Sequence, residues 1–378
     1  MAAAPPSWHL GIDIGGTKVA LRAESADGRT EEHTFLWPND QDGPDRDLAL
    51  LSDGVATLAA RTGDGFQAVG VAVPATVGPD ERVTSWPSRP SWTGLALGPA
   101  LRALVPGAAI AWADDGDVAA LAEAAAADCA NLLYIGVGTG IGGGLVLDGR
   151  LCPGPGRGSF ELGHLVVALG GPVCVCGRQG CLQAIASGPA TLARARELHG
   201  EPVTYEELRE ALRTARPWAT AAIDGTCQAL ATAIMGVTEL LHPGLAVIGG
   251  GFTAGIDNLV DRIATHLTPM SRPGRPAPPV APARLGGLSS LRGAVLLARA
   301  VTDGAVPSAA AAAPVRGDTR GAASTTPPLF IKRRHECTNV SPSSPTSRIR
   351  CGHPPPSGRP PKPSRDIGGR ASGALSTS

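Results

Sequence analysis

The sequence predicts an α/β protein built from two related lobes that face each other across a cleft. The first observation is a repeated pattern: residues 9–24 and 131–150 each read as an apolar strand, a glycine-rich turn and a second strand. The second is that further strand and helix patterns follow each hairpin, as in a duplicated α/β architecture. The third is the length of 378 residues, which exceeds the roughly 100–200 residues of one typical domain.

The first lobe is expected over residues 1–115. Its hairpin at 9–24 ends at the turn dipeptide Asp27-Gly28, and the apolar run at 68–73 predicts a short buried strand. The alanine-rich residues 117–126, preceded by Asp114-Asp115, predict a helix. We expect a last helix near residues 291–301 to complete this lobe.

The second lobe is expected over residues 116–290, with a zinc loop at 164–181. Thr204 and Glu207 have the spacing of a capping box, which predicts a helix that begins at Thr204. A long apolar helix over 218–241 should end before His242, and a strand at 245–248 should follow. The stretch 136–144 holds more glycine than a hairpin needs, which we attribute to crowding of the backbone against a polyphosphate.

Residues 303–378 differ from the rest of the chain in composition and charge. They are rich in Pro, Ser and Arg, contain 11 Lys/Arg against 4 Asp/Glu, and show almost no apolar periodicity. We therefore predict a disordered basic tail. Residues 1–302 hold 22 basic and 29 acidic residues, a net charge of −7. An acidic body argues against nucleic acid as the main ligand, because phosphate contacts need clustered cations.

The sequence also lacks the usual signals for a membrane or secreted protein. No apolar run approaches the ~18 residues that span a bilayer, and the first residues lack a basic-then-apolar leader. We therefore expect a cytoplasmic protein without a membrane partner.

The first glycine turn carries residues suited to bind phosphate. In Asp13-Ile14-Gly15-Gly16-Thr17-Lys18, the glycines let backbone N–H groups approach an anion, Thr17 adds a hydroxyl, and Asp13 can hold a Mg²⁺-bound water. One such turn can equally be a tight hairpin that merely needs glycine. The second turn, with Gly138, Thr139 and Gly140, repeats the pattern, and the repetition favours a phosphate site. Neither turn matches a Walker A or dinucleotide fingerprint, because both lead into a second strand.

Asp115 is the candidate general base. A carboxylate just before a helix is commonly an N-cap or a partner of the helix dipole. In a kinase, however, a carboxylate within hydrogen-bond reach must accept the proton of a weakly nucleophilic hydroxyl as phosphoryl transfer proceeds. Asp114, Asp115 and Asp117 crowd one turn, and three like charges cost stability unless ligands or N–H groups compensate them.

One cluster of residues has the composition of a structural zinc site. His164, Cys174, Cys176 and Cys181 supply one imidazole and three thiolates, and Gly177 and Gly180 allow the bends of a small chelate loop. The alternative is a chance cluster of thiols. Because four protein ligands leave no open coordination position, we expect the metal to have a structural role.

The sequence resembles the ROK family, which contains sugar kinases and sugar-responsive repressors. The matching segments run in family order across residues 8–301, and only the tail lies outside them. They are residues 13–18, the acidic turn before 117–123, and residues 138–140, 161–164, 174–182 and 247–251.

The resemblance implies a duplicated two-lobe fold of the actin-like ATPase (ribonuclease H-like) type. It implies that Asp115 is the general base, that Glu161 and His164 bind sugar hydroxyls, and that His164 gives its other nitrogen to zinc. Family repressors carry a DNA-binding domain ahead of the first phosphate turn, whereas only 12 residues precede Asp13 here, so we expect the kinase branch. ATP with Mg²⁺ would be held by both hairpin turns and by Gly249, Gly250 and Gly251.

Three positions depart from the family pattern. Asp114 and Asp117 stand where family kinases usually have Asn, and Gln183 stands where they have Glu after Cys-Leu. Asp114 and Gln183 would face the sugar, so these exchanges between amide and carboxylate bear on the choice of substrate.

The sequence leaves two hypotheses about function, which belong to different classes of protein. The first is an ATP-dependent hexose kinase that acts on the 6-OH of glucose, with an N-acetylhexosamine as the alternative substrate. The second is a catalytically weak sugar-binding regulator that kept the fold. The resemblance also allows a homodimer.

Overall fold

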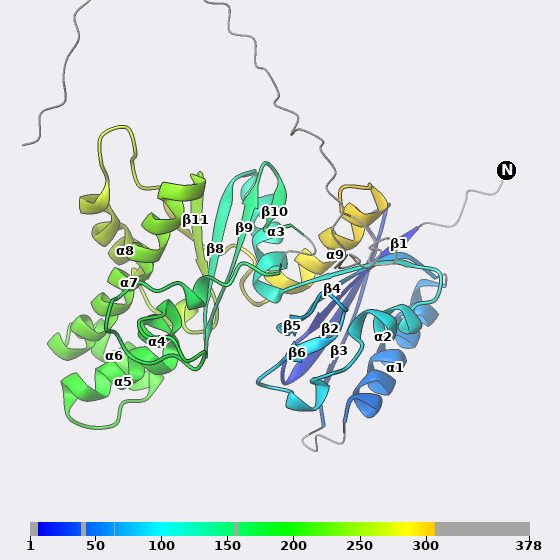
Figure 1. The fold of residues 1–378 in the computed structure, drawn as a ribbon, viewed down its shortest axis with the longest axis horizontal. Helices are drawn as coiled ribbons and strands as arrows, with labels where there is room; N and C mark the ends of the chain where they lie inside the picture. Colours follow the sequence, from blue (N-terminus) through cyan, green and yellow to red (C-terminus); the bar gives the residue numbers. More distant parts are fainter. Residues whose placement is uncertain (1–6, 39–42, 64, 155–157, 307–378) are drawn as a thin grey trace, which may run out of the picture. The chain divides into compact units, whose positions relative to one another are not determined.

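The computed structural model describes residues 7–38, 43–63, 65–154 and 158–306 (Figure 1). These residues contain two five-stranded sheets and a small two-stranded one. No helix among them is long and apolar enough to cross a membrane. Apart from residues 303–306, the tail predicted at 303–378 lies outside the described residues.

The first large sheet contains the N-terminal hairpin and has the strand order β3-β2-β1-β4-β7. Strands β1, β2 and β3 pair antiparallel, and β4 and β7 run parallel to β1. The predicted hairpin at 9–24 and the strand at 68–73 are confirmed, whereas the charged sequence of β3 shows little apolar alternation and was missed. The strands are β1 (Trp8–Ile14), β2 (Lys18–Ser25), β3 (Thr30–Leu36), β4 (Phe66–Ala72) and β7 (Ala109–Ala113), with β5 (Thr76–Val77) and β6 (Val83–Ser85) in the small sheet.

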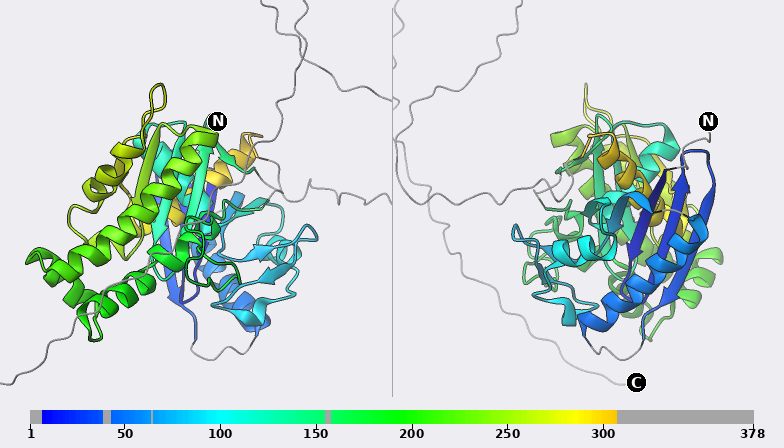
Figure 2. Two further views of the ribbon diagram at one scale, coloured as in Figure 1. Left: turned by 60° about the vertical axis from the view of Figure 1, so that its left-hand side comes forward. Right: turned by 90° about the vertical axis from the view of Figure 1, so that its right-hand side faces the viewer.

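Helices cover both faces of this sheet. Helices α1 (Pro44–Thr62) and α2 (Leu97–Leu104) share one hydrophobic cluster with Val71, whereas the next residue, Ala72, packs with α9 (Ser289–Thr302) on the other face. Figure 2 shows α1 and α9 on opposite sides of the strands. Gly70 of β4 allows α9 to lie directly on the sheet, because a Cβ there would sit 2.0 Å from the carbonyl oxygen of Ala294. The predicted last helix is therefore confirmed, and it packs on the first sheet.

The second large sheet repeats the plan of the first. Its strand order is β10-β9-β8-β11-β12. As in the first sheet, three strands (β10, β9 and β8) pair antiparallel, and the other two (β11 and β12) run parallel to β8, the first strand of the hairpin. The hairpin at 131–150 and the strand at 245–248 are confirmed. The strands are β8 (Leu132–Val137), β9 (Ile141–Leu147), β10 (Arg150–Cys152), β11 (Leu245–Gly249) and β12 (Val280–Pro282).

The glycine-rich stretch 136–144 has a different explanation from the one expected. Only residues 138–140 form the turn, and Gly142, Gly143 and Gly144 belong to β9. A Cβ at Gly144 would lie 2.4 Å from the carbonyl oxygen of Gly116 in α3, and one at Gly143 would lie 2.9 Å from Cβ of Leu162. The attribution of all the extra glycine to a polyphosphate is therefore wrong, because two of these residues permit close packing within the protein.

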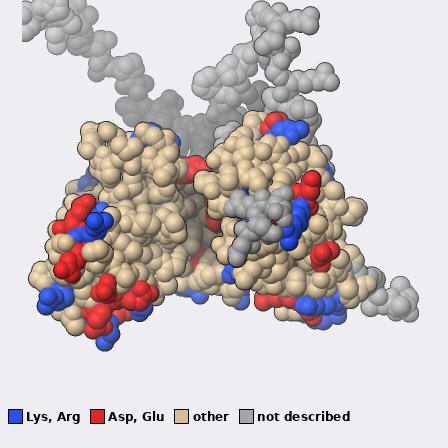
Figure 3. Space-filling model, turned by 90° about the horizontal axis from the view of Figure 1, so that it is seen from below, with Lys and Arg blue, Asp and Glu red and all other residues tan. Residues whose placement is uncertain are grey.

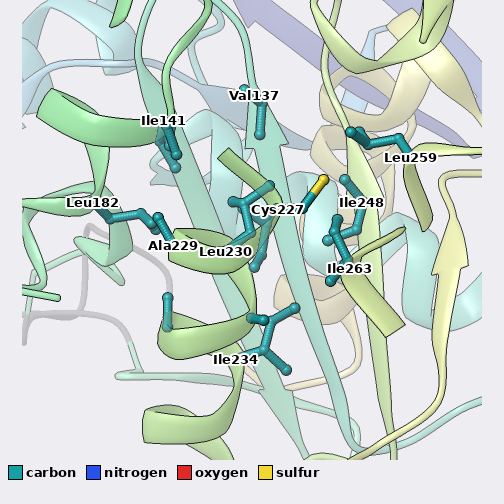
Figure 4. Packing of buried hydrophobic residues seen from close by; sticks show 14 of the residues in the cluster. Val137, Ile141, Leu182, Cys227, Ala229, Leu230, Ile234, Ile248, Leu259 and Ile263 are labelled. Atoms are coloured by element: carbon teal, nitrogen blue, oxygen red, sulfur yellow. The ribbon is translucent and has the colours of Figure 1, made fainter. Parts of the chain in front are cut away.

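The largest hydrophobic core lies between the second sheet and a layer of helices. Helix α7 (Pro217–Leu241) confirms the predicted long helix, and its Cys227, Leu230 and Ile234 pack in one cluster with Val137 and Ile248 of the sheet (Figure 4). Helix α6 (Tyr205–Arg213) begins with the predicted capping box. The other helices on this side are α4 (Leu182–Ala186), α5 (Gly188–His199) and α8 (Leu259–Leu267).

Helix α3 (Asp115–Ala127) links the two sheets. It packs on β8 and β9, and it also packs on α9, which covers the first sheet. The buried carboxylate of Glu123 in α3 accepts hydrogen bonds from the backbone N–H groups of Arg284 and Leu285 and from the hydroxyl of Ser289. These bonds fix the segment that leads into α9.

Candidate active site

The two predicted phosphate turns occupy equivalent places in the two sheets. Each joins the first and second strands of a hairpin, β1 to β2 and β8 to β9. One backbone hydrogen bond closes each turn. It joins Gly15 N to Lys18 O in the first turn and Gly138 N to Gly140 O in the second, at 2.9 Å in both. The side chains of Thr17, Lys18 and Thr139 are exposed, so they are free to contact a ligand.

A cavity lies beside the predicted glycine run. It has a volume of about 850 Å³, within the range of typical ligand pockets, and Gly249, Gly250 and Gly251 line it together with Tyr134 and Ser289. Gly250 has φ of 95°, a conformation that glycine adopts readily. The hydroxyl of Thr253 donates to the carbonyl of Gly249 at 2.8 Å and so holds this turn from behind.

The acidic turn sits at the N-terminus of α3, and its capping residue is Asp114. Asp114 Oδ1 accepts a hydrogen bond from the backbone N–H of Gly116 at 3.0 Å, and Asp115 is the first residue of the helix. The alternative role as N-cap therefore belongs to Asp114 and not to Asp115. Burial raises the pKa of Asp115, and hydrogen bonding to the backbone N–H of Gly116 and to Asp114 lowers it by a smaller amount.

Burial raises the pKa of every aspartate in this turn. Desolvation is the largest cause for Asp114, Asp115 and Asp117, and it raises the pKa of Asp117 to about 7. The neighbouring charges of Asp115 and Glu161 raise the pKa of Asp114 and Asp117 further. No lysine or arginine of the described chain is among the groups that shift these three pKa values. The turn is thus an acidic cluster without a compensating cation in this part of the chain.

The first phosphate turn and the acidic turn converge. Burial raises the pKa of Asp13 to about 6, and the next largest cause is the charge of Asp115. The two carboxylates therefore lie near enough for their charges to interact. Seen from below, the surface is hollowed between the two lobes, and acidic side chains show inside the hollow (Figure 3).

The pH dependence of the free energy of unfolding should show how much the buried acidic cluster destabilises the fold. The raised pKa means that folded Asp117 holds its proton from about pH 4 to about pH 7 while the unfolded chain releases it, so stability falls as pH rises through this window. We expect Asp117→Asn to match the parent in melting temperature near pH 4 and to exceed it by a margin that grows up to about pH 7 and is full near pH 8, measured without ligands. Equal melting temperatures at about pH 8 would contradict this reading.

Two further predicted sugar-binding residues have different surroundings: the charge of Glu161 raises the pKa of Asp114 and Asp117, whereas Gln183 lies at the second phosphate turn. Glu161 is exposed, accepts from the hydroxyl of Ser159 at 2.7 Å, and directly precedes a 3-10 turn that ends at His164. Gln183 lies at the start of α4, where its Oε1 accepts from the backbone N–H of Ile141 at 3.0 Å. The amide oxygen of Gln183 therefore holds the end of the second phosphate turn.

The four predicted metal ligands come together. Their ligand atoms all lie within 4.8 Å of one another, in a loop braced by hydrogen bonds between residues 167 and 180 and between 174 and 178. The distance is 3.7 Å between the sulfurs of Cys176 and Cys181, and 3.6 Å between Cys174 Sγ and His164 Nδ1. Tetrahedral zinc with ordinary bond lengths requires about 3.8 Å between two sulfurs and about 3.6 Å between sulfur and nitrogen. These two distances match those of a tetrahedral zinc site.

One group of residues at the site was missed. Asp47, Arg89 and Trp37 lie behind the first phosphate turn, and Asp47 and Arg89 are both buried. They come from separate elements, so no local spacing signals their contact. The only hint in the sequence is the concentration of Trp and Arg at 86–92, which is ambiguous by itself.

The chain is similar to known sugar kinases. A kanosamine kinase from Amycolatopsis mediterranei is 58% identical over 300 residues, covering 79% of this chain and 99% of the relative. A glucokinase from Thermotoga maritima is 28% identical, covering 65% of this chain and 82% of the relative. Among solved structures, a ROK hexokinase from Thermus thermophilus aligns with a TM-score of 0.70 at 29% identity, covering 79% of this chain and 99% of that one. A ROK family glucokinase from Streptomyces griseus, in complex with glucose and AMPPNP, aligns with a TM-score of 0.63 at 25% identity, covering 78% and 99%.

The fold, the site and these relatives define the class: a sugar kinase with the two-lobed, actin-like ATPase fold. The chain belongs to the ROK family, whose sequence model matches residues 9–301. The kinase hypothesis is therefore favoured over the catalytically weak regulator.

Proposed function

We propose that this chain transfers the γ-phosphoryl group of ATP to the primary hydroxyl of kanosamine, which is 3-amino-3-deoxyglucose. The observation that carries the proposal is the acidic cluster of Asp114, Asp115 and Asp117, with Glu161 beside it. The 58% identity to a kanosamine kinase over nearly its whole length supports the same substrate. The proposal replaces glucose, the substrate expected from the sequence, with an amino sugar.

A positively charged substrate would account for Asp114 and Asp117, the two aspartates at positions where family kinases usually have asparagine. A neutral hexose leaves the like charges of the cluster in place, and desolvation then holds part of the cluster protonated. An ammonium group within a few ångströms favours the ionised carboxylates and offers three hydrogen-bond donors. Carboxylates at positions where family kinases usually have amides would therefore select a cationic sugar over a neutral one.

The reaction needs a base, and we propose Asp115 for that role. As the sugar oxygen bonds to the γ-phosphorus, the Asp115 carboxylate takes the hydroxyl proton and the bond from phosphorus to the β,γ-bridging oxygen breaks, releasing ADP. The raised pKa of Asp115 makes its carboxylate a stronger base than a solvated aspartate. Asp13 would hold Mg²⁺ through water, as its position beside Asp115 allows.

The rest of the site would bind the nucleotide and the sugar. Backbone N–H groups of Gly16 and Thr17 in the first turn, and of residues 139–140 in the second, would contact the phosphates, with Lys18 as a nearby cation. The cavity beside 249–251 has the volume for the nucleoside. Glu161, His164 and Gln183 would contact sugar hydroxyls around the acidic turn.

An ADP-release assay over a panel of sugars tests the proposed function. We expect kcat/KM for kanosamine to exceed that for glucose by at least about a hundredfold, since charged hydrogen bonds contribute about 1.5–3 kcal/mol each. Glucosamine, with its ammonium at a different carbon, and N-acetylglucosamine, with no ammonium, separate the effect of charge from the effect of position. Equal kcat/KM values for glucose and kanosamine would refute the amino-sugar assignment and leave a general hexose kinase.

We also propose that His164, Cys174, Cys176 and Cys181 hold one structural zinc ion. The distances between the ligand atoms support it, and so does the chemistry of three thiols and one imidazole. His164 would bind through Nδ1, the ring atom next to Cys174 Sγ, which leaves Nε2 for a sugar hydroxyl. Zinc would then fix the orientation of a substrate-binding imidazole.

The zinc proposal predicts the result of a metal analysis. Purified protein should contain one zinc per chain, and Cys176→Ser should lose it and lower the melting temperature by at least about 5 °C. Cys129→Ser is the matched control, because Cys129 lies outside the cluster and its thiol donates only to the carbonyl of Asn131. Full zinc content in the Cys176 variant would exclude this site.

A further inference from the structure

A buried network of charged and aromatic side chains lies behind the first phosphate turn. Asp47 near the start of α1 and Arg89 in the loop after β6 form a bidentate ion pair, with Nη2 at 2.7 Å from both carboxylate oxygens. Their side chains are 5% and 3% exposed. Trp92 also donates to Asp47 at 2.7 Å, and the guanidinium of Arg89 lies 4.3 Å from the centre of the Trp37 ring. A charge pair this well buried and hydrogen-bonded has a fixed geometry.

The network binds the backbone carbonyls of the turn. Trp37 Nε1 donates to Gly15 O at 2.7 Å, and the backbone N–H of Trp37 donates to Thr17 O at 2.9 Å. Between them, Arg89 Nη1 reaches Gly16 O at 3.5 Å. Three successive carbonyl groups of the turn are therefore held on one side, by two residues of one cluster.

These hydrogen bonds to the carbonyl groups also fix the direction of the N–H groups of the same peptides. In a trans peptide the C=O and the following N–H point in opposite directions. Holding the carbonyls of Gly15 and Gly16 therefore points the N–H groups of Gly16 and Thr17 away from the network. Neither N–H donates to an acceptor in the described parts of the chain. Successive N–H groups of a turn that have no acceptor within the protein can form an anion-binding concavity.

We propose that Trp37, Arg89 and Asp47 are positioning residues for the nucleotide: they orient the peptide groups of the first phosphate turn before ATP arrives. This inference rests on the proposed role of that turn in binding phosphate. The network adds no charge at the phosphate itself, because the Arg89 guanidinium is neutralised by Asp47 and stacked on Trp37. Its effect on nucleotide affinity comes from preorganisation, which lowers the cost of ordering the turn on binding.

The experiment is a Trp37→Phe variant, which keeps a ring under Arg89 but removes the indole donor to Gly15. Loss of one such hydrogen bond should raise the KM for ATP about fivefold, while the KM for the sugar stays within about twofold. Direct titration with AMPPNP should show the same loss of affinity. Unchanged ATP KM and AMPPNP affinity in a folded Trp37→Phe protein would overturn the inference.

Trp86→Phe is the matched control. It shrinks another buried indole of the same hydrophobic cluster, but one whose Nε1 has no hydrogen-bond partner among the described residues. Both variants should lower the melting temperature by a similar amount. Only Trp37→Phe should weaken nucleotide binding about fivefold. An equal rise in ATP KM for both variants would show that general loosening is responsible and would refute a specific role for Trp37. Absence of AMPPNP binding by the parent protein would instead overturn the proposed function.

Discussion

Asp115→Asn should lower kcat at least a hundredfold while the KM for the sugar changes little. General bases contribute about 10²–10⁴-fold in rate, and the amide keeps the size and most hydrogen bonds of the carboxylate but cannot take the proton. The structure sharpens this expectation, because Asp114 caps α3 and Asp115 does not. The variant therefore keeps the cap of α3, which Asp114 supplies.

The melting temperature provides the control for this experiment. Removing one of several buried like charges should leave the stability of the Asp115→Asn protein unchanged or raise it, measured near pH 8 without ligands. AMPPNP affinity should also stay within about threefold of the parent. A variant that phosphorylates its sugar at the parental rate would remove Asp115 from the mechanism.

Asp114→Asn should weaken or abolish the preference for a cationic sugar. We expect kcat/KM for kanosamine to fall about 10–150-fold, which corresponds to the loss of a charged hydrogen bond of about 1.5–3 kcal/mol. Glucose should be used as well as before or better, because asparagine keeps an acceptor for the cap and adds a donor for a sugar hydroxyl. The measurement is kcat/KM for both sugars at one pH, near 7.5.

A second substitution in the same helix controls for nonspecific effects. Asp128 is an exposed residue at the C-terminal end of α3 with φ of 51°, a conformation that asparagine also tolerates. Asp128→Asn removes the same charge from the chain and should leave both kcat/KM values unchanged. If Asp114→Asn lowers activity equally for kanosamine and glucose, the residue supports the fold of the site and does not select the substrate.

Local sequence patterns predict what local forces determine. The two hairpins and the cysteine loop follow from glycines, apolar runs and ligands that lie within 18 residues of one another, as between His164 and Cys181. The start of α3 was placed two residues late, because an aspartate-rich turn offers several equivalent caps and only the backbone decides among them. The pair of Asp47 and Arg89 is separated by 42 residues, and its contact depends on how α1 and the loop after β6 pack. No spacing rule can predict such a pair.

The glycines of β9 are a second case in which the sequence alone does not reveal the role of a residue. Glycine in a phosphate turn and glycine under a helix look alike in a sequence, since both leave room for a close neighbour. Only the packing of α3 on β9 shows that Gly144 makes room for the protein itself.

The position of α9 also bears on how the chain is made. The helix that covers one face of the N-terminal sheet consists of residues 289–302, so β1 and β4 are synthesised long before their partner. At about 5–20 residues per second, the more than 200 residues between β4 and α9 take at least about ten seconds to translate. During that time the apolar face of Ala72 and its neighbours has no native cover, although the sheet's other face can already pack on α1. The N-terminal half therefore reaches its native state only after nearly the entire described chain has been synthesised.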